Sequence, residues 1–86
     1  MKEKFDASDG DVVVAKMIRK LRRDREVSQV ELAATIEQGR NVLARIERGQ
    51  RQVTLPELHR ICEFLGIPLG DFVAEYLKQV TRAAPE

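Results

Sequence analysis

The segment AATIEQGRNVLARIERGQR, from Ala33 to Arg51, places two short apolar-patterned stretches on either side of a very short connection. The first stretch stops at Ile36 and the second starts at Val42, with EQGRN between them. The apolar spacing on both sides is that of two short helices that cross, and the small Ala33 lies where the second helix must approach closely. The segment therefore predicts a pair of crossing helices joined by a tight turn.

Helical periodicity extends over most of the chain, and no strand-like alternation appears. Two capping boxes, Ser28 with Glu31 and Thr54 with Glu57, predict two helix starts. Gly49 and Gly66 are placed to end helices. The sequence therefore predicts an all-α chain of five helices, with the first over about 11–25 and the last over about 69–82. The residues predicted to face the core are Val14, Met17, Ile18, Leu21, Leu32, Ala33, Ile36, Leu43, Ile46, Leu58, Ile61, Cys62 and Leu65.

The 86 residues suffice for one small domain. We expect a flexible N-terminal arm over 1–10, a folded domain over 11–82 and a frayed tail over 83–86. No apolar run approaches membrane-spanning length, and no targeting pattern is visible at the N-terminus. The single cysteine rules out an internal disulfide, so a reducing, cytoplasmic setting is predicted.

The formal net charge is only +1, but the charge is unevenly distributed. Residues 16–25 carry six Lys or Arg against one Asp, and residues 40–52 carry four Arg against one Glu. Segments 1–15, 26–39 and 53–86 are net negative, by two, three and two charges. A fold that brings the two basic segments together would create a surface for nucleic acid. The alternative is that both are solvated helix faces.

The motif SQVELA followed by RIERG, with IRKLRRDREV before it and LPELHRICEFLGIPLGDF after it, resembles the Cro/phage-repressor-type (XRE-like) helix-turn-helix DNA-binding family. The resemblance runs from about Ile18 to Phe72. It implies a five-helix, repressor-like helix-turn-helix domain. It also implies a sequence-specific transcriptional regulator that binds a palindromic operator in double-stranded DNA as a homodimer. With no effector domain expected, such a regulator acts by occupying DNA or by touching RNA polymerase directly.

Within the family, the chain resembles small phage repressors and restriction-modification controller proteins. The similarity to controller proteins rests on RGQRQVTLPEL followed by a long last helix. A promoter-binding antitoxin is an alternative within the family. The alternative from a different class is a helical protein-interaction module in which DNA binding is weak or lost.

The turn departs from the pattern of the family, which has glycine at the position of Glu37 and an aliphatic residue at Gln38. In the usual turn Glu37 is left-handed, which costs a non-glycine residue about 1–2 kcal/mol, and Gly39 is the N-cap of the next helix. In the rival frame Gly39 ends a longer helix and Asn41 is the next N-cap. We favour the usual frame, because the apolar spacing on both sides matches without an insertion.

In the usual frame the resemblance makes the helix that follows Gly39 the recognition helix, whose N-terminal residues reach base edges in the major groove. Arg pairs with guanine, Asn with adenine, and Ala can contact a thymine methyl. The alternative is that these side chains are ordinary exposed residues. The predicted base-contacting residues are Arg40, Asn41, Ala44 and Arg45.

The resemblance also implies contacts with the DNA backbone and a structural ion pair. Gln29 matches the glutamine of the family that contacts a phosphate. Arg22 and Glu47 resemble a buried salt bridge between the first and third helices, and the alternative is two unrelated surface charges. The predicted phosphate-contacting residues are Gln29, Arg19, Arg23, Arg48, Arg51 and Gln52.

The last helix carries an apolar stripe longer than the core of a small domain needs, so we predict a dimer through it. Its predicted interface residues are Phe72, Val73, Tyr76, Leu77 and Val80. His59 and Cys62 are too few for a metal site, and no catalytic constellation is present. We therefore expect no metal, no cofactor, no small-molecule ligand and no enzyme activity.

Overall fold

The computed structural model describes the backbone of residues 7–83 and the side chains of residues 10–81. Within these residues the chain forms helices and no strand, so the all-α prediction is confirmed. None of the described helices combines the length and the apolar content needed to cross a membrane. The helices are α1 (Ala7–Asp24), α2 (Gln29–Thr35), α3 (Arg40–Glu47), α4 (Leu55–Leu65) and α5 (Leu69–Ala83).

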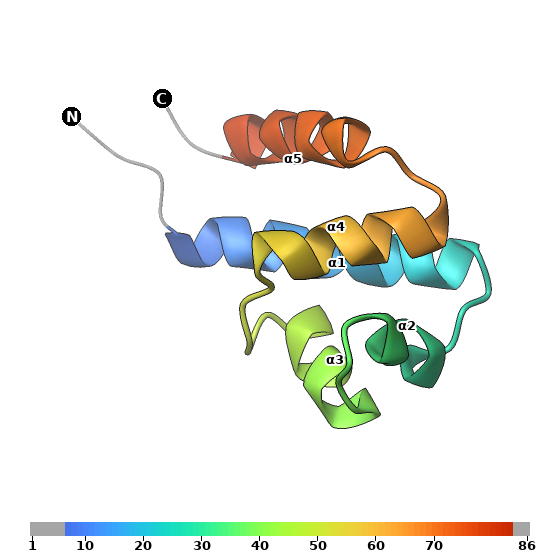
Figure 1. Ribbon diagram of the computed structural model, residues 1–86. Coiled ribbons are helices and arrows are strands. Elements are labelled where there is room, and N and C mark those ends of the chain that lie inside the picture. The colour runs from blue at the N-terminus through green and yellow to red at the C-terminus, as the bar shows by residue number, and fades with distance from the viewer. Residues whose placement is uncertain (1–6, 84–86) are drawn as a thin grey trace.

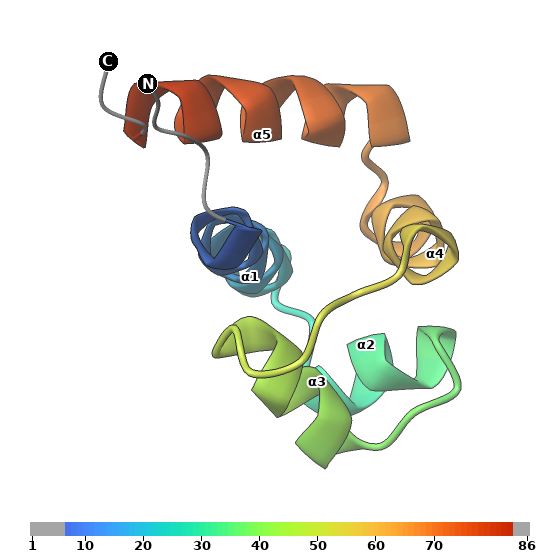
Figure 2. The ribbon, with the colours of Figure 1, turned by 90° about the vertical axis from the view of Figure 1, so that its left-hand side faces the viewer.

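The helices are arranged in three tiers (Figure 1). Helices α1 and α4 both lie in the middle tier, α2 and α3 cross beneath them, and α5 lies on the opposite side (Figure 2). Contacts connect α1 with both α3 and α5, and α4 with both α2 and α5. The crossing pair α2–α3 is therefore supported from one side and leaves its other side open.

One apolar cluster fills the space between the tiers. Ile18, Leu32, Leu43, Ile46 and Ile61 are almost completely buried, and they come from α1, α2, α3 and α4. The predicted core residues all belong to this cluster or pack against its edge. The helical spacing of apolar residues therefore identified the inward faces correctly.

Both predicted capping boxes are present. The Glu31 N–H donates to Ser28 Oγ at 3.0 Å, and the Ser28 N–H donates to Glu31 Oε1 at 2.9 Å. Thr54 and Glu57 repeat this arrangement at the start of α4, with distances of 3.2 and 3.0 Å. Each box satisfies two backbone donors that an open helix end would leave without a partner.

Four connections use a residue with left-handed backbone conformation after a helix. Gly49 and Gly66 have φ of +74° and +76°, as the sequence predicted. Glu26 and Glu37 have φ of +56° and +58°, and they follow α1 and α2. Next to Glu37, the Gln38 N–H donates to Ala33 O at 3.0 Å and closes the end of α2. The spacing of apolar residues did not predict the left-handed conformation of Glu26.

The favoured frame of the turn is confirmed. Glu37 is left-handed, and Gly39 is the N-cap of α3, with φ −87° and ψ 169°. The rival frame is wrong, because Asn41 lies within α3 and not at its N-cap. A Cβ added at Gly39 would meet no atom within 4 Å. The turn therefore needs neither the flexibility of glycine nor its small size at position 39.

Two predicted boundaries differ from those of the structure. Residues 7–10, expected to belong to a flexible arm over 1–10, are helical, because α1 begins at Ala7. Apolar periodicity reports only the part of a helix that packs on the core, and the first turn of α1 precedes that part. At the other end, α5 includes Ala83. The remaining parts of both predicted tails, 1–6 and 84–86, lie outside the described residues.

Replacement of Glu37 by glycine is expected to stabilise the fold by about 0.5–1 kcal/mol, because glycine adopts a left-handed conformation without the steric cost of a Cβ. Urea unfolding measures the change. Gly66→Ala is the matched control and is expected to destabilise the fold. Gly66 is also left-handed, and a Cβ added there would meet no atom within 4 Å, so the loss measures the cost of the left-handed conformation alone. A Glu37→Gly protein less stable than wild type would contradict the assigned turn.

Candidate nucleic-acid interface

Helix α3 presents a polar outer face. Arg40, Asn41 and Arg45 are exposed, while Leu43 and Ile46 are buried beneath them. The first turn of α3 has no side-chain cap and no acidic residue. Two of the exposed residues are cationic, and all three carry the N–H donors that recognise base edges and phosphates. The structure therefore brings these three predicted residues onto one exposed surface.

The outward placement expected for Ala44 is wrong. Ala44 is only 8% exposed, and it borders a hollow between α3 and the neighbouring helices. It precedes the buried Glu47 by three residues, so both lie on the same side of α3. We therefore remove Ala44 from the predicted base contacts.

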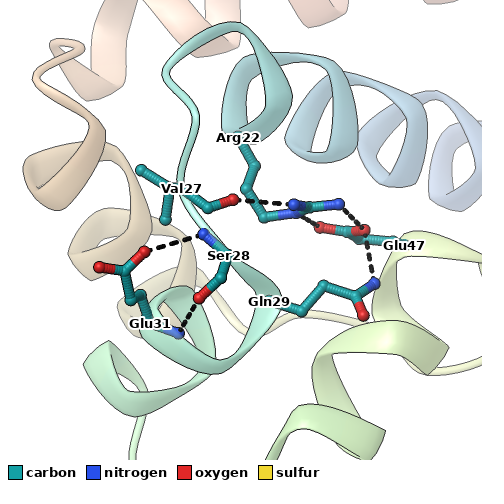
Figure 3. A network of polar contacts seen from close by, with 6 residues as sticks. All are labelled: Arg22, Val27, Ser28, Gln29, Glu31 and Glu47. Carbon is teal, nitrogen blue, oxygen red and sulfur yellow. Dashed lines mark hydrogen bonds and ion pairs between the residues drawn. The ribbon is translucent and has the colours of Figure 1, made fainter.

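Arg22 and Glu47 form the predicted buried ion pair. Arg22 Nε donates to Glu47 Oε2 at 2.6 Å and Nη2 donates to Oε1 at 3.1 Å, as Figure 3 shows. The exposed fractions of the two side chains are 13% and 3%. This bidentate geometry is the strong form of an arginine–carboxylate contact. The pair fixes the end of α3 against α1.

The ion pair is part of a larger network (Figure 3). Arg22 Nη1 donates to Val27 O at 2.8 Å, in the connection between α1 and α2. Gln29 Nε2 donates to Glu47 Oε1 at 3.1 Å, from the first residue of α2. The Glu47 carboxylate therefore accepts hydrogen bonds from α1 and from α2. The side chain of Gln29, predicted to contact a phosphate, is directed at this carboxylate.

A basic hollow lies beside this network. Its volume is about 420 Å³, and Arg22 and Glu47 form part of its wall. Because Arg22 compensates Glu47, the remaining arginines give the hollow a net positive charge. Three arginines predicted to contact phosphates, Arg19, Arg23 and Arg48, line it together with Gln29 and Ala44.

Arg51 and Gln52, also predicted to contact phosphates, are engaged within the protein. Arg51 Nη1 and Nη2 donate to Glu57 Oε1 and Oε2 at 2.8 and 3.2 Å. Gln52 Nε2 donates to Asp11 Oδ2 at 3.1 Å, from the loop before α4 to α1. The hydrogen bond from Arg51 lowers the pKa of Glu57, and this carboxyl group raises the pKa of Arg51 in turn. These contacts hold the loop that follows α3.

The apolar stripe on α5 divides between the core and the surface. Phe72 is 3% exposed and belongs to the core, so its predicted place in a dimer interface is wrong. Tyr76 also packs against the core. Val73 and Leu77 are exposed, at 38% and 55%, whereas Val80 is half-buried. Phe64 on α4 is 50% exposed, and the sequence pattern did not predict it as a surface residue of interest.

The described residues contain no group of three His, Cys, Asp or Glu side chains placed to hold a metal ion. His59 Nε2 lies 3.6 Å from Oε2 of Glu63, one turn further along α4. Cys62 is buried in the core, and burial raises the pKa of its thiol. His59 therefore contacts a neighbour on its own helix, and Cys62 packs in the core.

Comparison with known proteins assigns the chain to a family. The model of the helix-turn-helix family HTH_3 matches residues 18–72, and the chain belongs to this family. The control protein C.MunI from Mycoplasma sp is 35% identical over 63 residues, which cover 72% of this chain and 85% of that protein. The cryptic phage CTXphi transcriptional repressor RstR from Vibrio cholerae is 31% identical over 58 residues. That match covers 67% of this chain and about half, 52%, of the repressor.

Solved structures of controller proteins are also similar to this chain. The restriction-modification controller protein C.AhdI from Aeromonas hydrophila has a TM-score of 0.67 and 30% identity, covering 73% of this chain and 91% of its own. A mutant of the controller protein C.Esp1396I, bound to its highest affinity operator site, has a TM-score of 0.73 and 25% identity. Here the coverage is 92% of this chain and 99% of the controller. The resemblance to phage repressors and controller proteins is confirmed.

Replacement of Glu47 by alanine is expected to destabilise the fold by about 3–5 kcal/mol, because it leaves the charge of Arg22 without its partner in a largely buried position. Thermal and urea unfolding measure the loss. A double replacement, Arg22→Met with Glu47→Leu, is expected to recover part of it, since no unpaired charge remains. A single variant that melts within a degree or two of wild type would show that the pair contributes little.

The contact between Arg51 and Glu57 is expected to make stability depend on pH. Because the pKa of Glu57 is lowered in the folded state, the stabilisation is present above the unfolded pKa, about 4.3, and is lost as pH falls through the lower folded pKa. Urea unfolding of wild type and Glu57→Gln should therefore differ most near pH 7 and converge at acidic pH. A difference that grows on acidification would contradict this assignment.

Proposed function

We propose that this chain is a sequence-specific DNA-binding transcriptional regulator that reads its operator with α3. The observation that carries the proposal is the exposed face of α3, which holds Arg40 and Asn41 in the first turn and Arg45 in the last turn. In helix-turn-helix proteins the second helix lies in the major groove, with its N-terminal residues at the base edges. The operator complex of the related C.Esp1396I controller supports the same use of the fold.

The basic hollow supports a separate role in holding the DNA backbone. Arg19, Arg23 and Arg48 come from α1 and from the end of α3, so their charges converge beside the reading surface. Backbone phosphates are held by such side chains without information about sequence. We assign these three arginines to phosphate contacts. Arg51, whose guanidinium pairs with Glu57, holds the loop after α3 instead.

The regulator acts as a homodimer in this proposal. Val73 and Leu77 are four residues apart on α5, so they form one exposed apolar strip on the tier opposite to α2 and α3. Exposed apolar side chains at helical spacing are characteristic of an interface between copies. A two-fold dimer would place two copies of α3 about one DNA turn apart on a palindromic operator.

The proposed setting is the cytoplasm, where the protein acts on DNA and contacts RNA polymerase without enzymatic activity of its own. The named relatives are regulators and control proteins, which supports this assignment. Occupation of the operator suffices for repression, and a dimer bound beside a promoter is placed to touch the polymerase.

Arg45→Ala is expected to weaken binding to the preferred operator by about 1–3 kcal/mol and to relax the preference at one base pair per half-site, because an Arg–guanine contact is lost. Selection of bound duplexes from a random library measures both effects. Arg40→Ala should relax a different position. Arg60→Ala, on α4, is the control and should leave the consensus unchanged.

The selection also separates the proposal from its alternative. If wild type selects no sequence and shows no salt-dependent affinity for random duplex DNA, the chain is a protein-interaction module and the proposed function is wrong. If wild type selects a sequence that neither arginine variant changes, α3 is not the reading helix.

Leu77→Asp is expected to shift the protein from dimer to monomer and to reduce binding to the full palindrome far more than binding to a single half-site, because a charge is placed in an apolar contact. Sedimentation at tens of micromolar measures the assembly. Lys78→Asp, at the next exposed position of α5, is the matched control and should leave the dimer intact. A monomeric wild type that binds isolated half-sites would contradict the dimer.

A further inference from the structure

A second charged depression lies on the outer face of α1, and we call it the α1 groove. Its volume is about 330 Å³, and residues of α1 alone line it: Lys16, Arg19, Lys20, Arg23 and Asp24. The four cationic side chains are exposed. Two of them, Arg19 and Arg23, also line the basic hollow. The α1 groove therefore continues the surface that we assign to phosphate contacts.

The charge of the α1 groove is available to a ligand. Four cations and one acid line it, so its net charge is +3. The acid, Asp24, accepts from Lys20 Nζ at 2.9 Å, but the two side chains are 51% and 76% exposed. An exposed pair of this kind is weak and is screened by salt. A ligand with several negative charges can therefore replace the Asp24 contact.

The cations are spaced along α1 in a way that suits a nucleic-acid strand. Lys16, Lys20 and Arg23 are four and three residues apart, so they share one face of the helix. From the first to the last of them the helix rises by about 10 Å, at about 1.5 Å per residue. One strand of a DNA duplex has a phosphate about every 3.4 Å along the duplex axis. The line of cations is long enough for about three phosphates.

The α1 groove leads away from the reading surface. Arg22 is directed toward α3, where it pairs with Glu47. Lys20 is about 200° away from Arg22 around the helix, and it also borders a cavity between α1 and α5. Helix α5 lies in the tier opposite to α3 (Figure 2). The groove thus extends from the basic hollow toward the side of the molecule that the read bases do not face.

We propose that the α1 groove binds the phosphate backbone of the DNA that flanks the operator, with Lys16 and Lys20 as its ligands. The proposal rests on the proposed function of α3. The flanking duplex bends toward α1 to reach these lysines, and the energy that bending costs is repaid by the added phosphate contacts. The protein then holds a longer stretch of DNA than the stretch whose bases it reads.

The test compares two duplexes that contain the same selected operator. The short duplex ends at the palindrome, and the extended duplex continues for about ten base pairs, one helical turn, at each end. Wild type is expected to bind the extended duplex about tenfold more tightly at low salt. A double variant, Lys16→Gln with Lys20→Gln, is expected to lose this gain and to bind the short duplex within about twofold of wild type, with the same consensus.

Salt dependence and bending give two further readouts. Each lost phosphate contact lowers the slope of log affinity against log salt concentration by about 0.9. The double variant is therefore expected to lower the slope by about 2 per protomer on the extended duplex, and to leave it unchanged on the short one. Energy transfer between dyes at the two ends of the extended duplex is expected to report a smaller bend with the double variant.

Two control variants separate the α1 groove from general electrostatics. Lys78→Gln removes an exposed lysine from α5, outside the groove, and should keep the gain from the flanks. Asp24→Asn changes the groove in the opposite direction, because it removes the one acid that lines it. It is expected to strengthen binding to the extended duplex and to leave binding to the short duplex unchanged.

The outcomes distinguish this proposal from the function on which it rests. A wild type that selects no sequence overturns the proposed function. A selective wild type that gains nothing from the flanks overturns the role of the α1 groove alone. The role is also overturned if the double variant retains the gain, or if it loses equal affinity for both duplexes, because the lysines then contact no flanking DNA.

Discussion

The buried carboxylate of Glu47 is the constraint on which the arrangement of the first three helices depends. A charge with 3% exposure is tolerated only when donors surround it. Arg22 supplies two donors from α1, and Gln29 supplies a third from α2. Because these residues are distant in sequence, the carboxylate is satisfied only when the three helices have met. Such a pair specifies geometry more than it adds net stability.

The same contact determines which side of α3 is exposed. Glu47 and Ala44 face α1 and α2, and Leu43 and Ile46 face the apolar cluster. The remaining arc of the helix carries the exposed polar residues, including Arg45. Arg19, Arg23 and Arg48, which do not pair with Glu47, line the adjacent hollow. One buried charge thus places both the proposed reading surface and the proposed backbone contacts.

Sequence patterns predicted most of this fold, because helix caps and helical periodicity depend on interactions between residues close in sequence. The predictions that failed depend on tertiary contacts. Both capping boxes and the N-cap at Gly39 depend on neighbours within a few residues, and they were predicted correctly. Ala44 was placed on the outer face because its small side chain carries no signal about orientation. Phe72 was assigned to a dimer because an apolar stripe does not show which residues meet their own core. The phosphate contacts of Gln29 and Arg51 stay predictions, and residue type could not show that acids on other elements also contact both side chains.

The distribution of charge shows why a net charge of only +1 does not argue against DNA binding. Arg19, Arg22, Arg23 and Arg48 line the hollow, and Arg40 and Arg45 lie on α3. The exposed acids Glu26, Glu31 and Glu37 lie on α2 and the turns that flank it. Fields from opposite charges cancel at long range but not within a Debye length of about 10 Å. In the proposed complex an approaching duplex is therefore attracted to one surface and repelled from the neighbouring one, which would orient the protein before bases are read.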